Sequence, residues 1–186
     1  MNRIIILASG SGTNAENIIK YFKNSKDIEV TNVLSNNKNA GVLERAKRLK
    51  VSSKVFSKKE LNSDEFLHFL KKEADFIILA GFLLKLPERI VQEFPDKIIN
   101  IHPALLPKYG GKGMYGMYVH EAVVKNNEKE SGITIHYVNE NYDDGAIIFQ
   151  KSVSLTEEDT PEDVAAKIHI LEQENFPRVI ENVLSN

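Results

Sequence analysis

The sequence lacks three features, and each absence excludes a class of function. It has no cysteine, which excludes disulfides, thiolate chemistry and cysteine-based metal sites and suits a reducing cytoplasm. It has no large excess of one charge, and a formal net charge of -2 gives no electrostatic reason to expect nucleic acid or an anionic membrane as partner. It has no long apolar run, because residues 4–8 are too few for a signal peptide or a membrane span and no other segment approaches one.

The remaining composition is that of an ordinary globular protein. Of the 186 residues, 42% are hydrophobic and 27% are charged, which is typical of soluble proteins. This length fits one domain with a substantial core, and no internal repeat or linker interrupts the chain. We therefore expect a single cytoplasmic domain spanning residues 1–186.

Strand and helix patterns alternate about five times in the first hundred residues, which predicts a parallel sheet with right-handed crossovers. Short apolar runs predict strands at residues 3–8, 28–34, 54–56, 75–80 and 97–101. Helical spacing predicts helices after residue 14, over residues 41–49, around residues 66–70 and from Pro87, as the first helical residue, to about Phe94.

The last third of the chain has a different pattern. Residues 132–138 and 146–153 read as strands separated by a short polar loop, which predicts an antiparallel addition to the sheet. Residues 160–184 form a long amphipathic pattern, with Thr160 as N-cap and Asp163 three residues later. The predicted fold is a three-layer, Rossmann-like α/β fold with a mostly parallel sheet and an antiparallel strand in the C-terminal third.

A glycine-rich segment, SGSGTN at residues 9–14, lies between the first strand and the first helix. Glycines allow close backbone approach, and a helix N-terminus offers free N–H groups to an anion. The segment fits the dinucleotide pattern G-x-G-x-x-A, but the second strand is followed by asparagines rather than the acid that would bind a ribose. No Gly-Lys-Ser/Thr follows, which excludes a Walker loop. The hydroxyl and amide groups favour a terminal phosphate, and the alternative is a tight turn without ligand.

A second polar group interrupts the apolar segment IINIHPALLP, where Asn100 and His102 precede Pro103. Two residues apart on a strand, both side chains point to one side of the sheet, at its carboxyl end and next to the glycine loop. An amide and a protonated imidazole are both donors, so together they can stabilise an oxyanion, and histidine can also transfer a proton. The alternative for His102 is a purely structural role.

A carboxylate near His102 would favour its charged form, and Asp143 and Asp144 lie in the loop between the two late strands. The alternative for Asp-Asp-Gly is an ordinary hairpin turn. The remaining histidines have no spacing typical of metal ligands, and we expect no metal. They are His68, His120 at the start of a helical stretch, His136 on a strand that could face the cleft, and His169 on the last helix.

Five motifs now occur in order: SGSGTN, LAGFLLKL at residues 79–86, NIHPALLP, YDDG and LEQENFP at residues 171–177. Together they resemble the phosphoribosylglycinamide formyltransferases, the folate-dependent enzymes of purine biosynthesis, over nearly the whole chain. NIHPxLLP alone is shared with other enzymes that use 10-formyltetrahydrofolate. The resemblance implies formyl transfer from 10-formyltetrahydrofolate, as co-substrate, to the amine of glycinamide ribonucleotide, by a monomer or homodimer.

The resemblance also implies roles for individual residues. Asn100 and His102 would stabilise the oxyanion of the tetrahedral intermediate, with His102 handling the proton and Asp143 supporting it. The family's usual turn is Asp-Gly-Gly, and here Asp144 replaces the first glycine, so the choice between the two aspartates stays open. Glycinamide ribonucleotide would be bound by Gly12, Thr13, Asn14, His169, Ile170, Leu171 and Glu172. Folate would be bound by Leu83, Leu84, Lys85, Leu86, Asn139, Glu140, Asn141 and Tyr142, together with Asn100 and Asp143.

A second departure from the family pattern is the stretch KYGGKGMYGMY, residues 108–118, which has four glycines within residues 110–116. We interpret it as a mobile loop over the active site, and the alternative is a surface loop without function. Lys108 and Lys112 could supply positive charge for the phosphate or for the glutamate tail of the folate.

Three other functions compete with this interpretation. Formyltetrahydrofolate hydrolase transfers the formyl group to water and usually has an additional N-terminal domain. Methionyl-tRNA formyltransferase usually has an additional C-terminal domain. With strands and helices predicted from residue 3 to the C-terminus, we expect neither. A nucleotide- or cofactor-binding protein without formyl transfer would have no need of the Asn-x-His pair.

Overall fold

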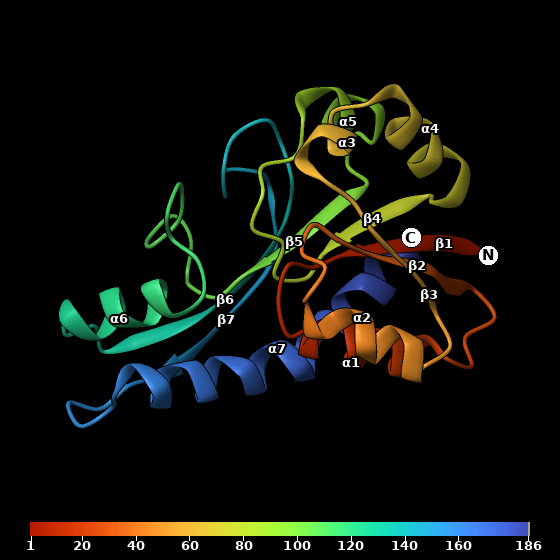
Figure 1. Ribbon diagram of the computed structural model, residues 1–186. Helices are drawn as coiled ribbons and strands as arrows, with labels where there is room; N and C mark the ends of the chain where they lie inside the picture. The colour runs from red at the N-terminus through yellow and green to blue at the C-terminus, as the bar shows by residue number, and fades with distance from the viewer. Residues whose placement is uncertain (186) are drawn as a thin grey trace.

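The computed structural model describes residues 1–185 and contains a seven-stranded mixed sheet between two layers of helices (Figure 1). The strand order is β3-β2-β1-β4-β5-β6-β7. Strands β1 to β5 run parallel, and β6 pairs antiparallel with both β5 and β7. The predicted fold class is confirmed. The strands are β1 (Asn2–Leu7), β2 (Ile28–Ser35), β3 (Ser52–Val55), β4 (Phe76–Leu79), β5 (Ile98–His102), β6 (Glu130–Tyr137) and β7 (Ile147–Ser154).

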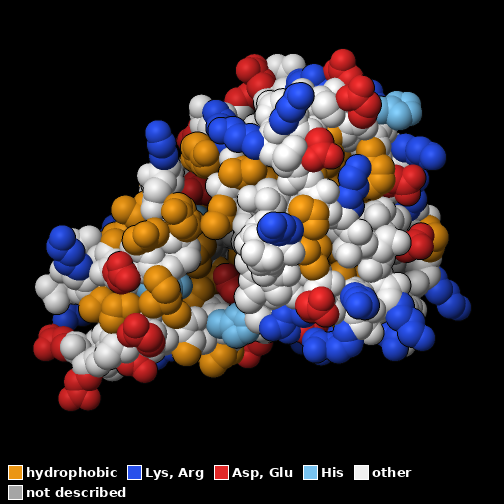
Figure 2. Space-filling model, viewed as in Figure 1, with side chains coloured by type: hydrophobic (Ala, Val, Ile, Leu, Met, Phe, Trp, Pro, Cys, Tyr) orange, Lys and Arg blue, Asp and Glu red, His pale blue; other side chains and the backbone are white. Residues whose placement is uncertain are grey.

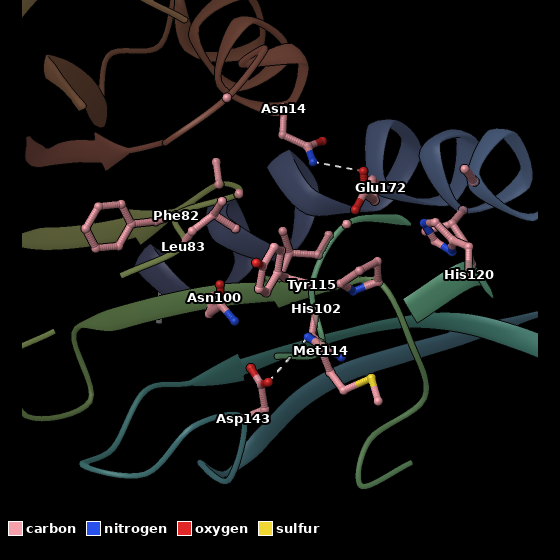
Figure 3. A pocket seen from close by; sticks show the side chains of 18 of the residues that line it. Asn14, Phe82, Leu83, Asn100, His102, Met114, Tyr115, His120, Asp143 and Glu172 are labelled. Carbon is pink, nitrogen blue, oxygen red and sulfur yellow. Dashed lines mark hydrogen bonds and ion pairs between the residues drawn. The ribbon is translucent and has the colours of Figure 1, made fainter. Parts of the chain in front are cut away.

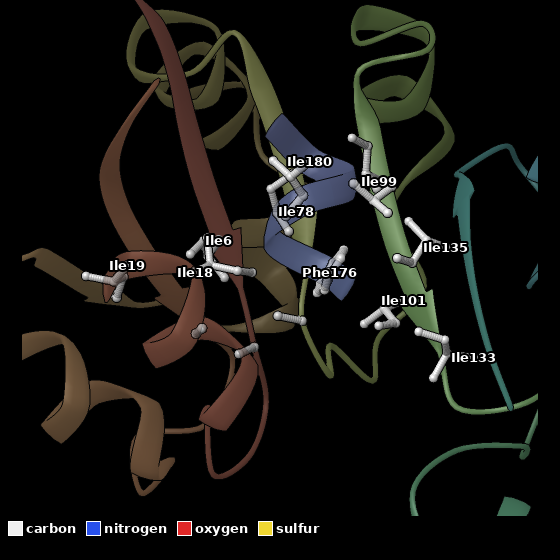
Figure 4. Packing of buried hydrophobic residues seen from close by; sticks show 14 of the residues in the cluster. Ile6, Ile18, Ile19, Ile78, Ile99, Ile101, Ile133, Ile135, Phe176 and Ile180 are labelled. Atoms are coloured by element: carbon white, nitrogen blue, oxygen red, sulfur yellow. The ribbon is translucent and has the colours of Figure 1, made fainter. Parts of the chain in front are cut away.

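The helices divide between the two faces of the sheet because the central strands are apolar on both. Along β1, Ile4 and Ile6 belong to one buried cluster, and Ile5 and Leu7 belong to the other, as the two-residue period of a strand requires. Figure 4 shows the first cluster, in which the helix residues Ile18 and Ile180 lie against strand residues.

The first cluster is covered by α1 (Thr13–Phe22), α2 (Gly41–Arg48), α6 (Met117–Lys125) and α7 (Pro161–Leu184). The second cluster is covered by α3 (Lys58–Leu61), α4 (Asp64–Glu73) and α5 (Glu88–Glu93). The N-cap predicted for α7 is confirmed, because Thr160 and Asp163 form a reciprocal capping box. This fixes the start of the long helix, which packs on the first cluster and ends beside the start of β1, where Asn2 donates to the Leu184 carbonyl oxygen at 2.9 Å.

Several local predictions were wrong or incomplete. The four-residue helix α3 was missed, although Ser57 and Glu60 form a capping box at its start. Strand β3 begins two residues earlier than predicted and ends before Phe56. Pro87 is the N-cap of α5 rather than its first helical residue. His120 lies within α6, which begins at Met117. Such short or edge elements have few apolar positions, so their sequence patterns are weak.

Strand β5 extends one residue further than predicted, to His102. Asn100 and His102 therefore do not stand in a loop past the strand. They are held within it by β6, where Asn100 pairs with His136 and His102 pairs with Thr134. Of residues 1–185, none belongs to a helix with both the length and the apolar character of a membrane span.

Candidate active site

A cavity of about 760 Å³ opens at the carboxyl ends of β1, β4 and β5, and Figure 2 shows the hollow near the middle of the molecule. The glycine loop, the end of β5, the insert after it and one face of α7 line this cavity. Ligands of parallel α/β sheets bind in this position. The cavity brings together the glycine loop, Asn100, His102, Asp143 and Glu172, which come from distant parts of the sequence (Figure 3).

The amide of Asn100 is oriented by His136, which the sequence did not identify as a site residue. Burial lowers the pKa of His136, so the ring is neutral at neutral pH. Its Nδ1 lies 2.9 Å from the carbonyl oxygen of Tyr137 and must donate to it, which leaves Nε2 as an acceptor. The Asn100 Nδ2 lies 3.1 Å from that Nε2. The amide therefore donates one N–H to His136 and keeps a second for a ligand.

The ring of His102 lies between two oxygen atoms. Its Nε2 donates to the carbonyl oxygen of Tyr109 at 2.7 Å, and its Nδ1 lies 3.6 Å from the Asp143 carboxylate (Figure 3). The His102 side chain is only 5% exposed. Both ring nitrogens thus face acceptors, the Tyr109 carbonyl oxygen and the Asp143 carboxylate.

Of the two aspartates, Asp143 lies at the site. Its side chain is 13% exposed, and its carboxylate lies 3.6 Å from His102 and 3.8 Å from His136. One oxygen also accepts from the backbone N–H of Gly111 at 2.9 Å. Asp144 instead accepts from the exposed Asn141 side chain at 3.2 Å and does not line the cavity. The position of Asp143, and not that of Asp144, matches a carboxylate that supports the imidazole.

The glycine loop lines the cavity opposite His102 and Asp143, and hydrogen bonds connect it to α7. Asn14 donates to Glu172 at 2.9 Å and accepts from Gln173 at 2.8 Å, so its side chain connects the start of α1 to the last helix. Glu172 also lies 3.5 Å from His169 and raises the pKa of that histidine. The loop, Glu172 and His169 thus form one polar wall.

The remaining residues implied by the resemblance divide into two groups. Leu83 and Tyr142 line the cavity, as do Gly12, Thr13 and Asn14. The side chains outside the lining include Ile170, which is exposed, and Leu171 and Leu86, which are buried in the two cores. Leu84, Lys85, Asn139, Glu140 and Asn141 also lie outside it. On α7, His169 and Glu172 line the cavity and Ile170 and Leu171 do not, because residues three apart in a helix lie on the same face.

The glycine-rich insert contacts the catalytic candidates directly. The backbone carbonyl of Tyr109 accepts from His102, and the backbone N–H of Gly111 donates to Asp143. A Cβ on Gly110 would lie 3.3 Å from the Cβ of that aspartate. Lys112 lines the cavity, whereas Lys108 pairs with Glu128 outside it. Tyr115 lines the cavity with an exposed side chain, and Met117 and Tyr118, which follow it in the sequence, are also exposed.

His120 also lines the cavity, and the sequence did not identify it as a site residue. It is buried, and burial lowers its pKa. Its Nδ1 has no hydrogen-bond partner among the described residues. Within residues 1–185, no group of three or more histidine and acidic side chains is placed to hold a metal ion.

The family model for formyl transferases matches residues 2–180, so the chain belongs to the formyl transferase family. Within this family it is similar to proteins named phosphoribosylglycinamide formyltransferase. It is 38% identical to the chloroplastic protein of Arabidopsis thaliana, covering 96% of this chain and 64% of that protein. It is 37% identical to the protein of Haemophilus influenzae, covering 97% of this chain and 86% of that one. It thus spans less than two thirds of the plant relative but most of the bacterial one.

Solved structures agree with this grouping. The phosphoribosylglycinamide formyltransferase of Anaplasma phagocytophilum superimposes with a TM-score of 0.89 at 34% identity, over 98% of this chain and 86% of that one. The protein of the same name from Bacillus halodurans gives 0.88 at 36% identity, over 99% and 96%. Both the sequence and the fold therefore align along nearly the full length of this chain.

Proposed function

We propose that this protein transfers the formyl group of 10-formyltetrahydrofolate to the amine of glycinamide ribonucleotide, a step of purine biosynthesis. The observation that carries the proposal is the juxtaposition of Asn100, His102 and Asp143 in the cavity that the glycine loop also lines. The names of the relatives support the choice of substrate. The absence of cysteine suits a cytoplasmic enzyme. We propose a single domain that acts as a monomer or homodimer.

In the proposed mechanism, the glycinamide amine attacks the formyl carbon, and the carbonyl oxygen becomes an oxyanion. The free N–H of Asn100 and an N–H of His102 donate to that oxygen. Collapse of the intermediate breaks the bond between the formyl carbon and the folate nitrogen, and that nitrogen takes a proton from His102. The attacking nitrogen releases its extra proton to water, and His102 takes up a proton from water before the next turnover. Asp143 stabilises the protonated ring during this transfer. Because Tyr109 now accepts from His102 Nε2, a substrate oxygen must replace that carbonyl.

The two substrates are assigned to opposite ends of the cavity. The phosphate is assigned to the backbone of Gly12, Thr13 and Asn14, at the start of α1, where N–H groups and the helix dipole favour an anion. The glycinamide portion is assigned to Glu172, whose carboxylate faces the cavity beside Asn14. His169 supports Glu172, and the buried Leu171 holds this turn of α7 against the core, whereas the side chain of Ile170 is exposed.

The folate is assigned to the end lined by Leu83 and Tyr142. The Lys85 ammonium lies 5.7 Å from the centre of the Tyr142 ring, which joins the two loops that carry these residues. Leu84 and Leu86 are proposed to shape the first loop, and Asn139, Glu140 and Asn141 the second. A half-apolar slot of this kind suits a pterin ring, which also needs polar backbone edges.

The nearest rival is hydrolysis of the same donor, and one assay separates the two. The absorbance of the folate is followed with both substrates present and again without glycinamide ribonucleotide. We expect formyl release only in the complete mixture. Equal rates in both mixtures would assign the protein to the hydrolases instead.

Asn100→Ala removes one oxyanion donor and is expected to lower kcat by about 10²-fold, because that donor acts mainly on the transition state. The dissociation constants of both substrates should change only a few-fold. Steady-state kinetics gives kcat and equilibrium binding gives the dissociation constants, with Asn62→Ala as control, since the Asn62 side chain donates to the Lys58 carbonyl oxygen in an exposed turn. An unchanged kcat in Asn100→Ala would remove this residue from the mechanism.

A further inference from the structure

The first turn of α2 contacts the glycine loop from the side opposite the cavity. The backbone N–H of Val42 donates to the carbonyl oxygen of Gly10 at 3.2 Å, and Arg45 Nε donates to that of Ser11 at 2.8 Å. The approach is close, because a Cβ on Gly12 would lie 2.4 Å from the Val42 side chain. Gly12 also has a φ of 79°, which favours glycine. Both constraints keep the loop against α2.

These two bonds fix the direction of two peptide groups. In a trans peptide the C=O and the N–H of one unit point in opposite directions. Because the carbonyls of Gly10 and Ser11 point toward α2, the N–H groups of Ser11 and Gly12 point away from it, toward the cavity that both residues line. Within residues 1–185, neither N–H is taken up by another residue. Both donors are free for an anion.

Arg45 is itself held in place by Glu16 on α1. The Glu16 carboxylate pairs with Arg45, with Lys20 at 2.6 Å and with Arg48 at 2.9 Å, and its side chain is 10% exposed. Hydrogen bonds from Lys20 and Arg45 lower the pKa of Glu16 to about 2, so it stays charged at neutral pH. The guanidinium is thus both neutralised and immobilised. It acts on the loop through its bond to Ser11 rather than as a free charge.

We propose that Arg45 is a positioning residue for phosphate recognition. By holding the Ser11 carbonyl, it keeps the Gly12 N–H directed into the cavity, and it does so without contacting the substrate. This inference rests on the proposed function only in naming the phosphate of glycinamide ribonucleotide as the anion. The chemistry of the site, two backbone donors at a helix start, is that of any phosphate monoester site.

The test compares Arg45→Met with Arg48→Met in the full-length protein. Both variants remove a guanidinium partner of Glu16 and keep an unbranched side chain, but only Arg45 bonds the loop. For Arg45→Met we expect KM for glycinamide ribonucleotide to rise about tenfold, the effect of losing one hydrogen bond to a charged group. Its kcat and its KM for the folate should stay within about twofold of wild type. Arg48→Met should match wild type in all three.

Two results would overturn the proposal. One is an unchanged KM in Arg45→Met, and the other is an equal rise in both variants, which would mean that loss of any Glu16 partner loosens the loop. Should Arg45→Met not fold, Arg45→Lys is compared with Arg48→Lys, because lysine keeps a positive charge beside Glu16 but has no N–H at the Nε position that bonds Ser11. A rise in KM for glycinamide ribonucleotide confined to Arg45→Lys is expected, and equal KM values in the two lysine variants would contradict the proposal.

Binding of ribose 5-phosphate by isothermal titration separates this inference from the proposed function. Weakened binding in Arg45→Met, relative to wild type and Arg48→Met, would support the role of Arg45 even if wild type failed to formylate glycinamide ribonucleotide. Equal binding in all three proteins would contradict that role whatever the reaction.

Discussion

Replacing His102 with alanine is expected to lower kcat by about 10³-fold, because it removes both the proton donor and one oxyanion donor. The ring is almost fully buried between Asp143 and the Tyr109 carbonyl, so water cannot easily replace it. The dissociation constants of both substrates should change only a few-fold, since the effect lies in the transition state. Single-turnover kinetics and equilibrium binding measure the two quantities separately.

His68→Ala is the matched control for this variant. His68 is an exposed histidine on α4, among the helices that cover the second core, and its loss should leave kcat unchanged. Thermal melts of both variants show whether either substitution unfolds the protein. A folded His102→Ala protein that keeps the wild-type kcat would exclude His102 as the acid.

Replacing Asp143 with asparagine is expected to lower kcat by about 10²-fold. Asparagine is the appropriate substitute because Asp143 has a φ of 51°, a left-handed conformation that asparagine tolerates and alanine resists. The amide oxygen can still accept from Gly111, so the insert keeps its contact while the charge that faces His102 is lost. Steady-state kinetics across pH 6 to about 9 measures the loss of kcat.

Asp144→Asn is the control, since it changes the same charge one residue away. The Asp144 side chain accepts from Asn141 in the exposed turn and does not line the cavity, so the kcat of Asp144→Asn should stay within about twofold of wild type. The opposite ranking, with Asp144→Asn the more damaged of the two, would assign the supporting role to Asp144 and contradict the geometry.

The strands and loops that carry the site can be predicted from the sequence, because each is encoded by a pattern of neighbouring residues. Buried strands have continuous apolar runs, and a two-residue spacing places Asn100 and His102 on one side of β5. Because both follow or end parallel strands, the glycine loop and the pair of Asn100 and His102 are expected at the carboxyl edge of the sheet, where ligands bind. The fold class, the positions of the main strands along the chain and the capping box at Thr160 follow from such patterns.

Other features depend on register and backbone contacts that no local pattern encodes. His136 meets Asn100 only because β6 pairs with β5 in one antiparallel register, and a shift by one residue would turn it to the other face. Tyr109 acts through its carbonyl, which every residue has, so its bond to His102 has no sequence signature. Arg45 reaches Ser11 across 34 positions of the chain.

The proposed function is tested most directly by following a carbon-13 formyl group from 10-formyltetrahydrofolate in the presence of glycinamide ribonucleotide, with mass spectrometry of the products. We expect the label to appear on the amine of the ribonucleotide, in equal amount to the tetrahydrofolate formed. Its rate of appearance should be similar in wild type and Asp144→Asn and about 10³-fold lower in His102→Ala. Label recovered as formate, at the same rate with and without the ribonucleotide, would contradict formyl transfer to this acceptor.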